Sequence, residues 1–157
     1  MKIAIISDNH GGKGYIDKLF QMGGFDYLFY LGDGIENLGA YKYLDNVYAV
    51  SGNCDFFSTD PNEQFFTLDG TRFFITHGNK YGVKYSMDSL ITRAKELGAN
   101  IVCFGHTHRV FMEEKDGVLF LNPGSFKAEN GVASGLILDI ENGKYSISTL
   151  RVKQGSD

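Results

Sequence analysis

The sequence has little of what extracellular or membrane-embedded proteins need. Its 157 residues include only two cysteines, Cys54 and Cys103. Two are too few for a disulfide framework, and we expect both to be free thiols. No apolar run approaches the roughly 20 residues of a membrane-spanning helix, and the N-terminal residues lack the basic region and apolar core of a signal peptide. These absences predict a cytoplasmic protein with no membrane contact.

Positive charge is also scarce. The chain has 15 lysines and arginines against 19 acidic residues, a net charge of -4, and its basic residues form no block. The chain therefore offers no evident continuous basic surface for a long polyanion, and we expect no stable nucleic-acid complex. A small phosphate compound is not excluded, because bound cations can supply the positive charge that side chains lack.

Length and composition are those of a globular protein. Hydrophobic residues make up 43% of the chain and charged residues 22%, both ordinary values. No internal repeat, linker or low-complexity segment interrupts the sequence. We therefore expect a single domain over residues 1–157 with a sizeable core, in which residues 151–157 form a frayed tail.

The order of the expected elements is typical of an α/β fold. Continuous apolar runs, the pattern of strands covered on both faces, alternate with helical segments, and the later part of the chain has hairpins around Asp-Gly and Asn-Gly turns. We expect strands at residues 2–6, 27–31, 47–50 and 101–104, and helices around residues 16–20, 38–44 and 86–97. Hairpins are expected at residues 64–76, 110–121 and 136–150. One domain with a mixed sheet or two packed sheets follows.

Metal-binding side chains stand just past the ends of the apolar runs. All four histidines of the chain are among them. The set is Asp8, His10, Asp33, Asn53, His77, His106 and His108. Each alone could be an ordinary polar loop residue, but ligands of α/β folds bind at the carboxyl ends of strands, and the set holds enough donors for two cations. Mixed imidazole and oxygen donors suit Mn, Fe, Zn or Ni better than Mg or Ca.

The pair His106 and His108 leaves two arrangements open. On an extended backbone alternate side chains share a face, so both rings could point the same way. In the turn that Gly105 permits, they could instead splay toward two different ions.

These residues carry a family resemblance. Asp8-x-His10, Gly32-Asp33, Gly52-Asn53, His77-Gly78 and Gly105-His106-x-His108 resemble the five ordered motifs of the calcineurin-like metallophosphoesterase superfamily, in particular its small single-domain prokaryotic phosphodiesterases. The resemblance implies a four-layer α/β/β/α sandwich of two packed mixed sheets, with a dinuclear metal site at the C-terminal ends of the strands. It assigns one metal to Asp8, His10, Asp33 and His108, and the other to Asp33, Asn53, His77 and His106, with Asp33 as the bridge.

The resemblance also implies a reaction. The chain would hydrolyse small or cyclic phosphodiesters by in-line attack of a metal-bound hydroxide, with Asp33, Asn53 and His106 holding the hydroxide and the phosphate. Two divalent ions per chain are expected, Mn first, with Ni, Fe or Zn as alternatives. A phosphomonoesterase, a nuclease or a non-catalytic scaffold such as the retromer sorting subunit are the alternative functions, and the complete donor set favours an enzyme. A homodimer or higher homo-oligomer is compatible with so compact an enzyme.

The role of Cys54, beside the motifs, stays open. Cys54 stands where many members of the superfamily have a histidine that is proposed to protonate the leaving group, and a thiol with a usual pKa near about 8.5 suits that step poorly. Either Cys54 only lines the pocket and Asp55 or water is the proton donor, or Cys54 has no chemical role.

Several other residues have a less specific interpretation. Asn122 is expected to support the site by a hydrogen bond to a ligand histidine. Lys80, Lys127 and Arg109 could attract phosphate, although a solvated surface is the more conservative interpretation. The phenylalanine pairs at residues 56–57, 65–66 and 73–74 are expected in the core, with a base-stacking wall or an oligomer face as the alternatives.

Overall fold

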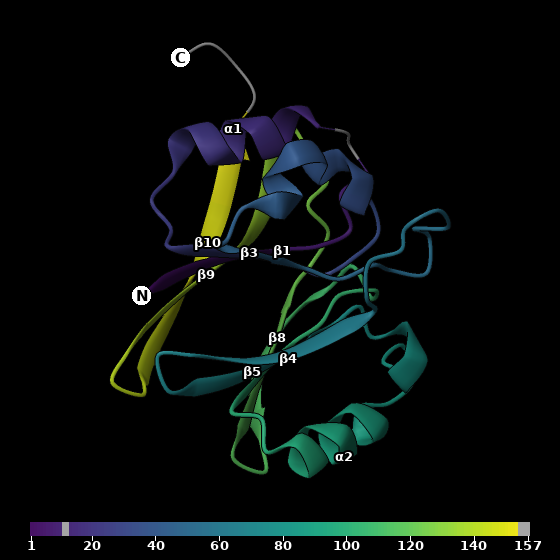
Figure 1. Ribbon diagram of the computed structural model, residues 1–157, viewed down its shortest axis with the longest axis vertical. Helices are drawn as coiled ribbons and strands as arrows, with labels where there is room; N and C mark the ends of the chain where they lie inside the picture. Colours follow the sequence, from purple (N-terminus) through teal and green to yellow (C-terminus); the bar gives the residue numbers. More distant parts are fainter. Residues whose placement is uncertain (11–12, 154–157) are drawn as a thin grey trace.

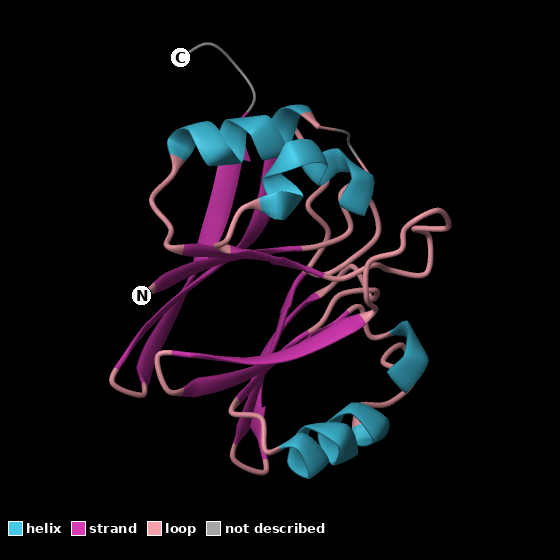
Figure 2. Ribbon diagram, viewed as in Figure 1, coloured by secondary structure: helices cyan, strands magenta, loops and turns pink. Residues whose placement is uncertain are grey.

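The computed structural model describes residues 1–10 and 13–153. These residues form two mixed five-stranded sheets that pack face to face (Figures 1 and 2). The first sheet has the order β10-β9-β1-β2-β3 and the second β4-β5-β6-β8-β7. The first contains β1 (Lys2–Ile6), β2 (Tyr27–Tyr30), β3 (Val47–Ala49), β9 (Val132–Glu141) and β10 (Lys144–Lys153). The second contains β4 (Glu63–Leu68), β5 (Thr71–Thr76), β6 (Ile101–Cys103), β7 (Val110–Lys115) and β8 (Val118–Pro123).

Helices cover the outer face of each sheet, which completes four layers (Figure 2). They are α1 (Gly14–Met22), α2 (Asp88–Leu97) and the 3₁₀ segments η1 (Ile35–Tyr43) and η2 (Asn79–Tyr81). On β1, Ile6 packs in one cluster with Leu19 of α1, whereas Ile5 belongs to the cluster between the sheets, with Ile75 of β5. Burial on both faces explains the unbroken apolar run of β1. The architecture confirms the expected α/β/β/α sandwich.

The strand directions bring the polar loops together. In the first sheet β1, β2 and β3 are parallel, and in the second β5, β6 and β8 are parallel. The loops after these strands leave the sandwich at one end (Figure 1). Backbone hydrogen bonds link them directly, from Asp8 N to Gly32 O at 2.9 Å and from Gly105 N to His77 O at 3.0 Å.

Two expectations about secondary structure need correction. The segment around residues 38–44 is a 3₁₀ helix rather than an α-helix, and it is broken at Gly39 (φ 50°, ψ -129°). Residues 151–153 are not a frayed tail, because they continue β10 in register with Val132 to Ser134 of β9, and Val152 is fully buried. The remaining residues of that expected tail, 154–157, lie outside the described residues.

The phenylalanine pairs divide. Phe73 and Phe74 are core residues as expected, whereas Phe56 and Phe57 are 81% and 100% exposed. The exposed pair lies in the loop between β3 and β4 and belongs to none of the three core clusters of the described residues. None of the described helices is both long enough and apolar enough to span a bilayer.

Candidate metal centre

The candidate ligands meet where the loops of both sheets converge, and four of them have unusual backbone conformations. Asp8 (φ 54°), Asp33 (φ 62°), His106 (φ 71°) and His108 (φ 61°) all lie in the left-handed region, which residues with side chains seldom adopt. The other non-glycine residues of this kind among the described residues are Asp or Asn in turns. The sharp turns at the strand ends thus aim donor side chains back over the sheet edge.

One group of donors consists of Asp8, His10 and His108, whose ligand atoms all lie within 4.8 Å of one another. Asp8 is fully buried, and its Oδ1 lies 3.1 Å from Nε2 of His108. The rings of His10 and His108 are 5.3 Å apart between centroids, and both histidines are exposed. This group therefore faces solvent on its imidazole side.

A second group consists of Asp8, Asp33 and His77, again within 4.8 Å, and it is buried. His77 Nε2 lies 3.3 Å from Asp33 Oδ2 and 3.2 Å from His106 Nδ1. The Nδ1–H of His77 donates to the carbonyl oxygen of Leu31 at 2.7 Å. That bond fixes the ring so that Nε2 faces the two carboxylates and His106, as in a metal-ligating histidine.

The electrostatics of the second group favour a charged carboxylate at Asp33. Burial alone would raise the pKa of Asp33, but hydrogen bonds from His77 and the Cys54 backbone lower it to about 2. Burial lowers the pKa of His77, while Asp33 and Asp8 outweigh that effect and raise it above its usual value. Burial and the nearby charge of His77 lower the pKa of His106. Anionic oxygens beside imidazoles are the donor set of a first-row divalent cation, so the residues fit such an ion.

The two expected histidine arrangements are now distinguished. His106 faces His77 while His108 faces His10 and Asp8, so the pair splays toward two groups. The two geometric groups share Asp8, whereas the family resemblance gives the shared position to Asp33. The division of ligands between two ions therefore stays a prediction.

Close packing explains the glycines of the motifs. A Cβ on Gly52 would overlap Asp33 Oδ1, and one on Gly105 would overlap Ser7 Oγ and lie 2.8 Å from Asp8 Oδ2. A Cβ on Gly32 would lie 2.7 Å from His77 Nδ1. Each loop thus passes too close to a neighbouring donor for any side chain.

Asn53, Cys54 and Asp55 occupy the loop after β3. Asn53 is exposed, and its Nδ2 lies 3.6 Å from Cys54 Sγ, so its role as a ligand stays a prediction. Both cysteines are free, as expected. Burial and the charge of Asp33 raise the pKa of the Cys54 thiol, while the Cys54 backbone N–H donates to Asp33 Oδ1 at 2.8 Å.

The two oxygens of Asp55 accept four backbone hydrogen bonds. The donors are the N–H groups of Asp33 (2.8 Å), Gly34 (2.8 Å), Ile35 (3.2 Å) and Gly52 (2.7 Å). A carboxylate has about four lone-pair positions, so none is left for a leaving group. These contacts tie the loop after β2 to the loop after β3.

Two supporting residues, Tyr30 and Ser125, were not predicted from the sequence. Tyr30 donates from its hydroxyl to Asp33 O at 2.5 Å and accepts from Asn9 N at 3.0 Å. Ser125 Oγ donates to Asp8 O at 2.7 Å. Asn122 does not contact a histidine ring, contrary to expectation. Its Nδ2 donates to the Gly105 carbonyl and to the Thr107 hydroxyl, both at 3.0 Å, and so supports the histidine loop through one backbone and one side-chain contact.

Comparisons with known proteins agree with this geometry. Residues 1–143 match the sequence model of the calcineurin-like phosphoesterase superfamily domain. The Bacillus subtilis protein named "Probable metallophosphoesterase YsnB" is 33% identical over 146 residues, which cover 90% of this chain and 86% of that protein. Phosphodiesterase MJ0936 of Methanocaldococcus jannaschii is 32% identical over 173 residues, with 92% and 96% covered. The crystal structure of a conserved Streptococcus pneumoniae protein, described as a predicted phosphoesterase, is 26% identical with a TM-score of 0.83, and covers 95% of this chain and 88% of that one.

Proposed function

Because the chain belongs to the calcineurin-like phosphoesterase superfamily, we propose that it is a dinuclear metal-dependent phosphodiesterase that hydrolyses small or cyclic phosphodiesters. The observation that carries the proposal is the pair of buried carboxylates, Asp8 and Asp33, within ligand distance of histidines from three loops. When bound, the cations supply positive charge for the phosphate oxygens and activate a water molecule.

The side chains of the site support hydrolysis without a covalent intermediate. Ser7 is fully buried, and its hydroxyl donates to Asp8 Oδ2 at 2.5 Å, so it is out of reach of a substrate. Ser125 Oγ donates to a backbone carbonyl, which is no base for its proton. The raised pKa of Cys54 keeps its thiol protonated near neutral pH. Water is therefore the nucleophile that the site favours.

The roles of the ligands follow from where they lie. Asp8, His10 and His108 would hold one ion, and Asp33, His77 and His106 the other, with the amide oxygen of Asn53 completing the second set. Asp33 remains the proposed bridge. His106 and His108 lie at the exposed side of the groups, which is where a substrate phosphate would enter.

We also infer the setting of the reaction. Manganese is the proposed working ion, and nickel, iron and zinc suit the same donors. The two free thiols support a reducing compartment, the cytoplasm. The proposed substrate is a small diester rather than nucleic acid, because the chain carries a net charge of -4. The proposed assembly is a homodimer or higher homo-oligomer.

Metal-stripped protein provides the test. Mn²⁺, Ni²⁺, Zn²⁺ or Mg²⁺ is added, and hydrolysis of bis-p-nitrophenyl phosphate is followed beside p-nitrophenyl phosphate. Calorimetry counts the ions bound. We expect two equivalents of metal to bind. We also expect a transition metal to restore hydrolysis of the diester, and Asp33→Asn to abolish it. Asp45→Asn is the matched control, since Asp45 is exposed. A monoester preference, or no turnover with two ions bound, would overturn the proposal.

A further inference from the structure

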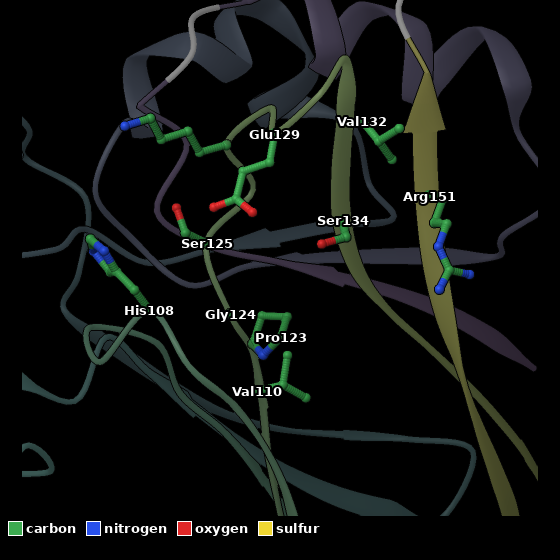
Figure 3. A pocket seen from close by; sticks show the side chains of 10 residues that line it. His108, Val110, Pro123, Gly124, Ser125, Glu129, Val132, Ser134 and Arg151 are labelled. Carbon is green, nitrogen blue, oxygen red and sulfur yellow. The ribbon is translucent and has the colours of Figure 1, made fainter.

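A cavity of about 490 Å³ opens beside the candidate metal centre, at His108. It lies between the ends of β7 and β8 in one sheet and β9 and β10 in the other (Figure 3). Its volume is within the range of small-ligand sites. Val110, Pro123 and Val132 form apolar walls, and Ser125 and Ser134 contribute hydroxyls. Only His108 is shared with the metal-binding groups.

The charges of the cavity differ from those of the chain as a whole. Lys127 and Arg151 line it against one acidic residue, Glu129, so the count is 2 - 1 = +1, whereas the chain carries -4. Lys127 and Arg151 are exposed, and among the described residues neither has an ion-pair partner. By contrast Lys42, Lys95 and Lys115 each pair with a carboxylate.

The cavity extends from the candidate metal centre toward Arg151. Figure 3 shows His108 at one side and Arg151 at the other, with Gly124 and Ser125 between them. A substrate whose scissile phosphate lies at the metal centre would extend one ester group past Ser125 toward Arg151. A guanidinium presents a planar fork of N–H donors that matches phosphate oxygens.

We propose that this cavity binds one ester substituent of the substrate and that Arg151, with Lys127, recognises a second phosphate on that substituent. The inference rests on the proposed phosphodiesterase function and narrows its substrate class to diesters with a further anionic group. A purely apolar substituent would fit the apolar walls but would leave the charged side chains of Lys127 and Arg151 without a partner.

Glu129 provides a second test, because the proposal predicts that neutralising Glu129 and neutralising Arg151 have opposite effects. Its carboxylate lies in the same cavity (Figure 3), where it would repel a second phosphate and accept hydrogen bonds from sugar hydroxyls. Neutralising Glu129 should therefore strengthen recognition of the second phosphate, whereas neutralising Arg151 should weaken it. If the substitutions merely disrupted the structure of the cavity, recognition of the second phosphate would be weakened in both variants.

The test uses two substrates that differ by one group: the p-nitrophenyl ester of thymidine 5′-phosphate, with and without a 3′-phosphate. The readout is the ratio of their kcat/KM values. The 3′-phosphate is expected to raise kcat/KM about tenfold at low salt, as one charge-assisted contact would. Arg151→Gln should bring the ratio toward one, Lys127→Gln should lower it, and Glu129→Gln should raise it. Lys144→Gln, the same charge change at the other end of β10, should leave it unchanged.

Calorimetry supplies an independent readout. Thymidine 3′,5′-bisphosphate is expected to bind metal-loaded protein about tenfold more tightly than thymidine 5′-phosphate, and Arg151→Gln should remove the difference. If neither ester is hydrolysed, the proposed function fails. The comparison of the two affinities still tests whether the cavity recognises a second phosphate. Equal affinities in the wild type, or an equal effect of Lys144→Gln, would overturn the assignment of the cavity.

Discussion

The position of Asp55 leads to the sharpest prediction about the site. An Asp55→Asn variant keeps the shape of the side chain but offers one oxygen instead of two. It can accept at most two of the four backbone hydrogen bonds that Asp55 receives from Asp33, Gly34, Ile35 and Gly52. Its amide NH₂ would face the other two N–H groups. The loops after β2 and β3 then lose at least two of the four hydrogen bonds that Asp55 accepts.

The size of the effect follows from these contacts. Each lost bond to the charged group contributes about 1.5 kcal/mol, so the variant should be destabilised by about 3 kcal/mol. For a chain of this length, about 1 kcal/mol shifts Tm by roughly 2–4 °C, which gives a fall of about 6–12 °C. Thermal unfolding of the metal-free protein measures it. Asp45→Asn is the control, because Asp45 is exposed and, among the described residues, makes no side-chain hydrogen bond.

A kinetic comparison separates positioning from proton donation. If Asp55 only orders the loops, the variant should slow bis-p-nitrophenyl phosphate and diphenyl phosphate by the same factor. If Asp55 protonates the leaving group, the phenyl ester should suffer far more, because phenol is the poorer leaving group. An unchanged Tm together with a selective loss on the phenyl ester would refute the reasoning from hydrogen bonds.

Three further predictions concern neighbouring contacts. Cys54→Ser should keep the wild-type kcat for bis-p-nitrophenyl phosphate, because the raised pKa of the thiol makes it an even poorer proton donor for the leaving group; a tenfold loss would give Cys54 a chemical role. Gly105→Ala should weaken metal binding measured by calorimetry at least tenfold, since its methyl group would overlap Ser7 Oγ; unchanged affinity would contradict the packing. The Lys42–Asp60 pair at 2.9 Å predicts a pH dependence. Burial would raise the pKa of Asp60, but hydrogen bonds from Lys42 and a serine lower it below its usual 3.8. The pair's contribution, under about 1 kcal/mol, is therefore present above pH 4 and lost as pH falls through the lowered pKa. The Tm deficit of Lys42→Met should shrink between pH 6 and pH 3, and a constant deficit would count against the pair.

The sequence was sufficient to locate the site because strand direction does most of the positioning. A buried strand such as β1 needs a continuous apolar run, and parallel strands end at the same edge of a sheet. Asp8, Asp33 and His106 each follow such a run, so their convergence could be predicted without coordinates. The turn chemistry of Asp69-Gly70 was equally local, with φ values of 49° and 80°.

What the sequence did not reveal depends on contacts between distant residues. Asp55 was considered only as a proton donor, because its partners Asp33 and Gly34 lie about twenty positions earlier. Arg151 was assigned to a tail, since nothing in a polar segment shows that β9 extends to pair with it. Phe56 and Phe57 were assigned to the core by their type, although both are exposed in the loop between β3 and β4.

The backbone conformations of the site show why these unpredicted residues matter. Asp8, Asp33, His106 and His108 all have positive φ, and such conformations cost about 1–3 kcal/mol each. Together that is roughly 4–12 kcal/mol, comparable with the net stability of an entire domain. The loops can hold these conformations only because fixed partners surround them. Asp55 and Tyr30 bind the backbone around Asp33, and Asn122 binds the loop of the two histidines. The donors are thus positioned by the fold itself, and a cation would add its binding energy to a site that is already arranged.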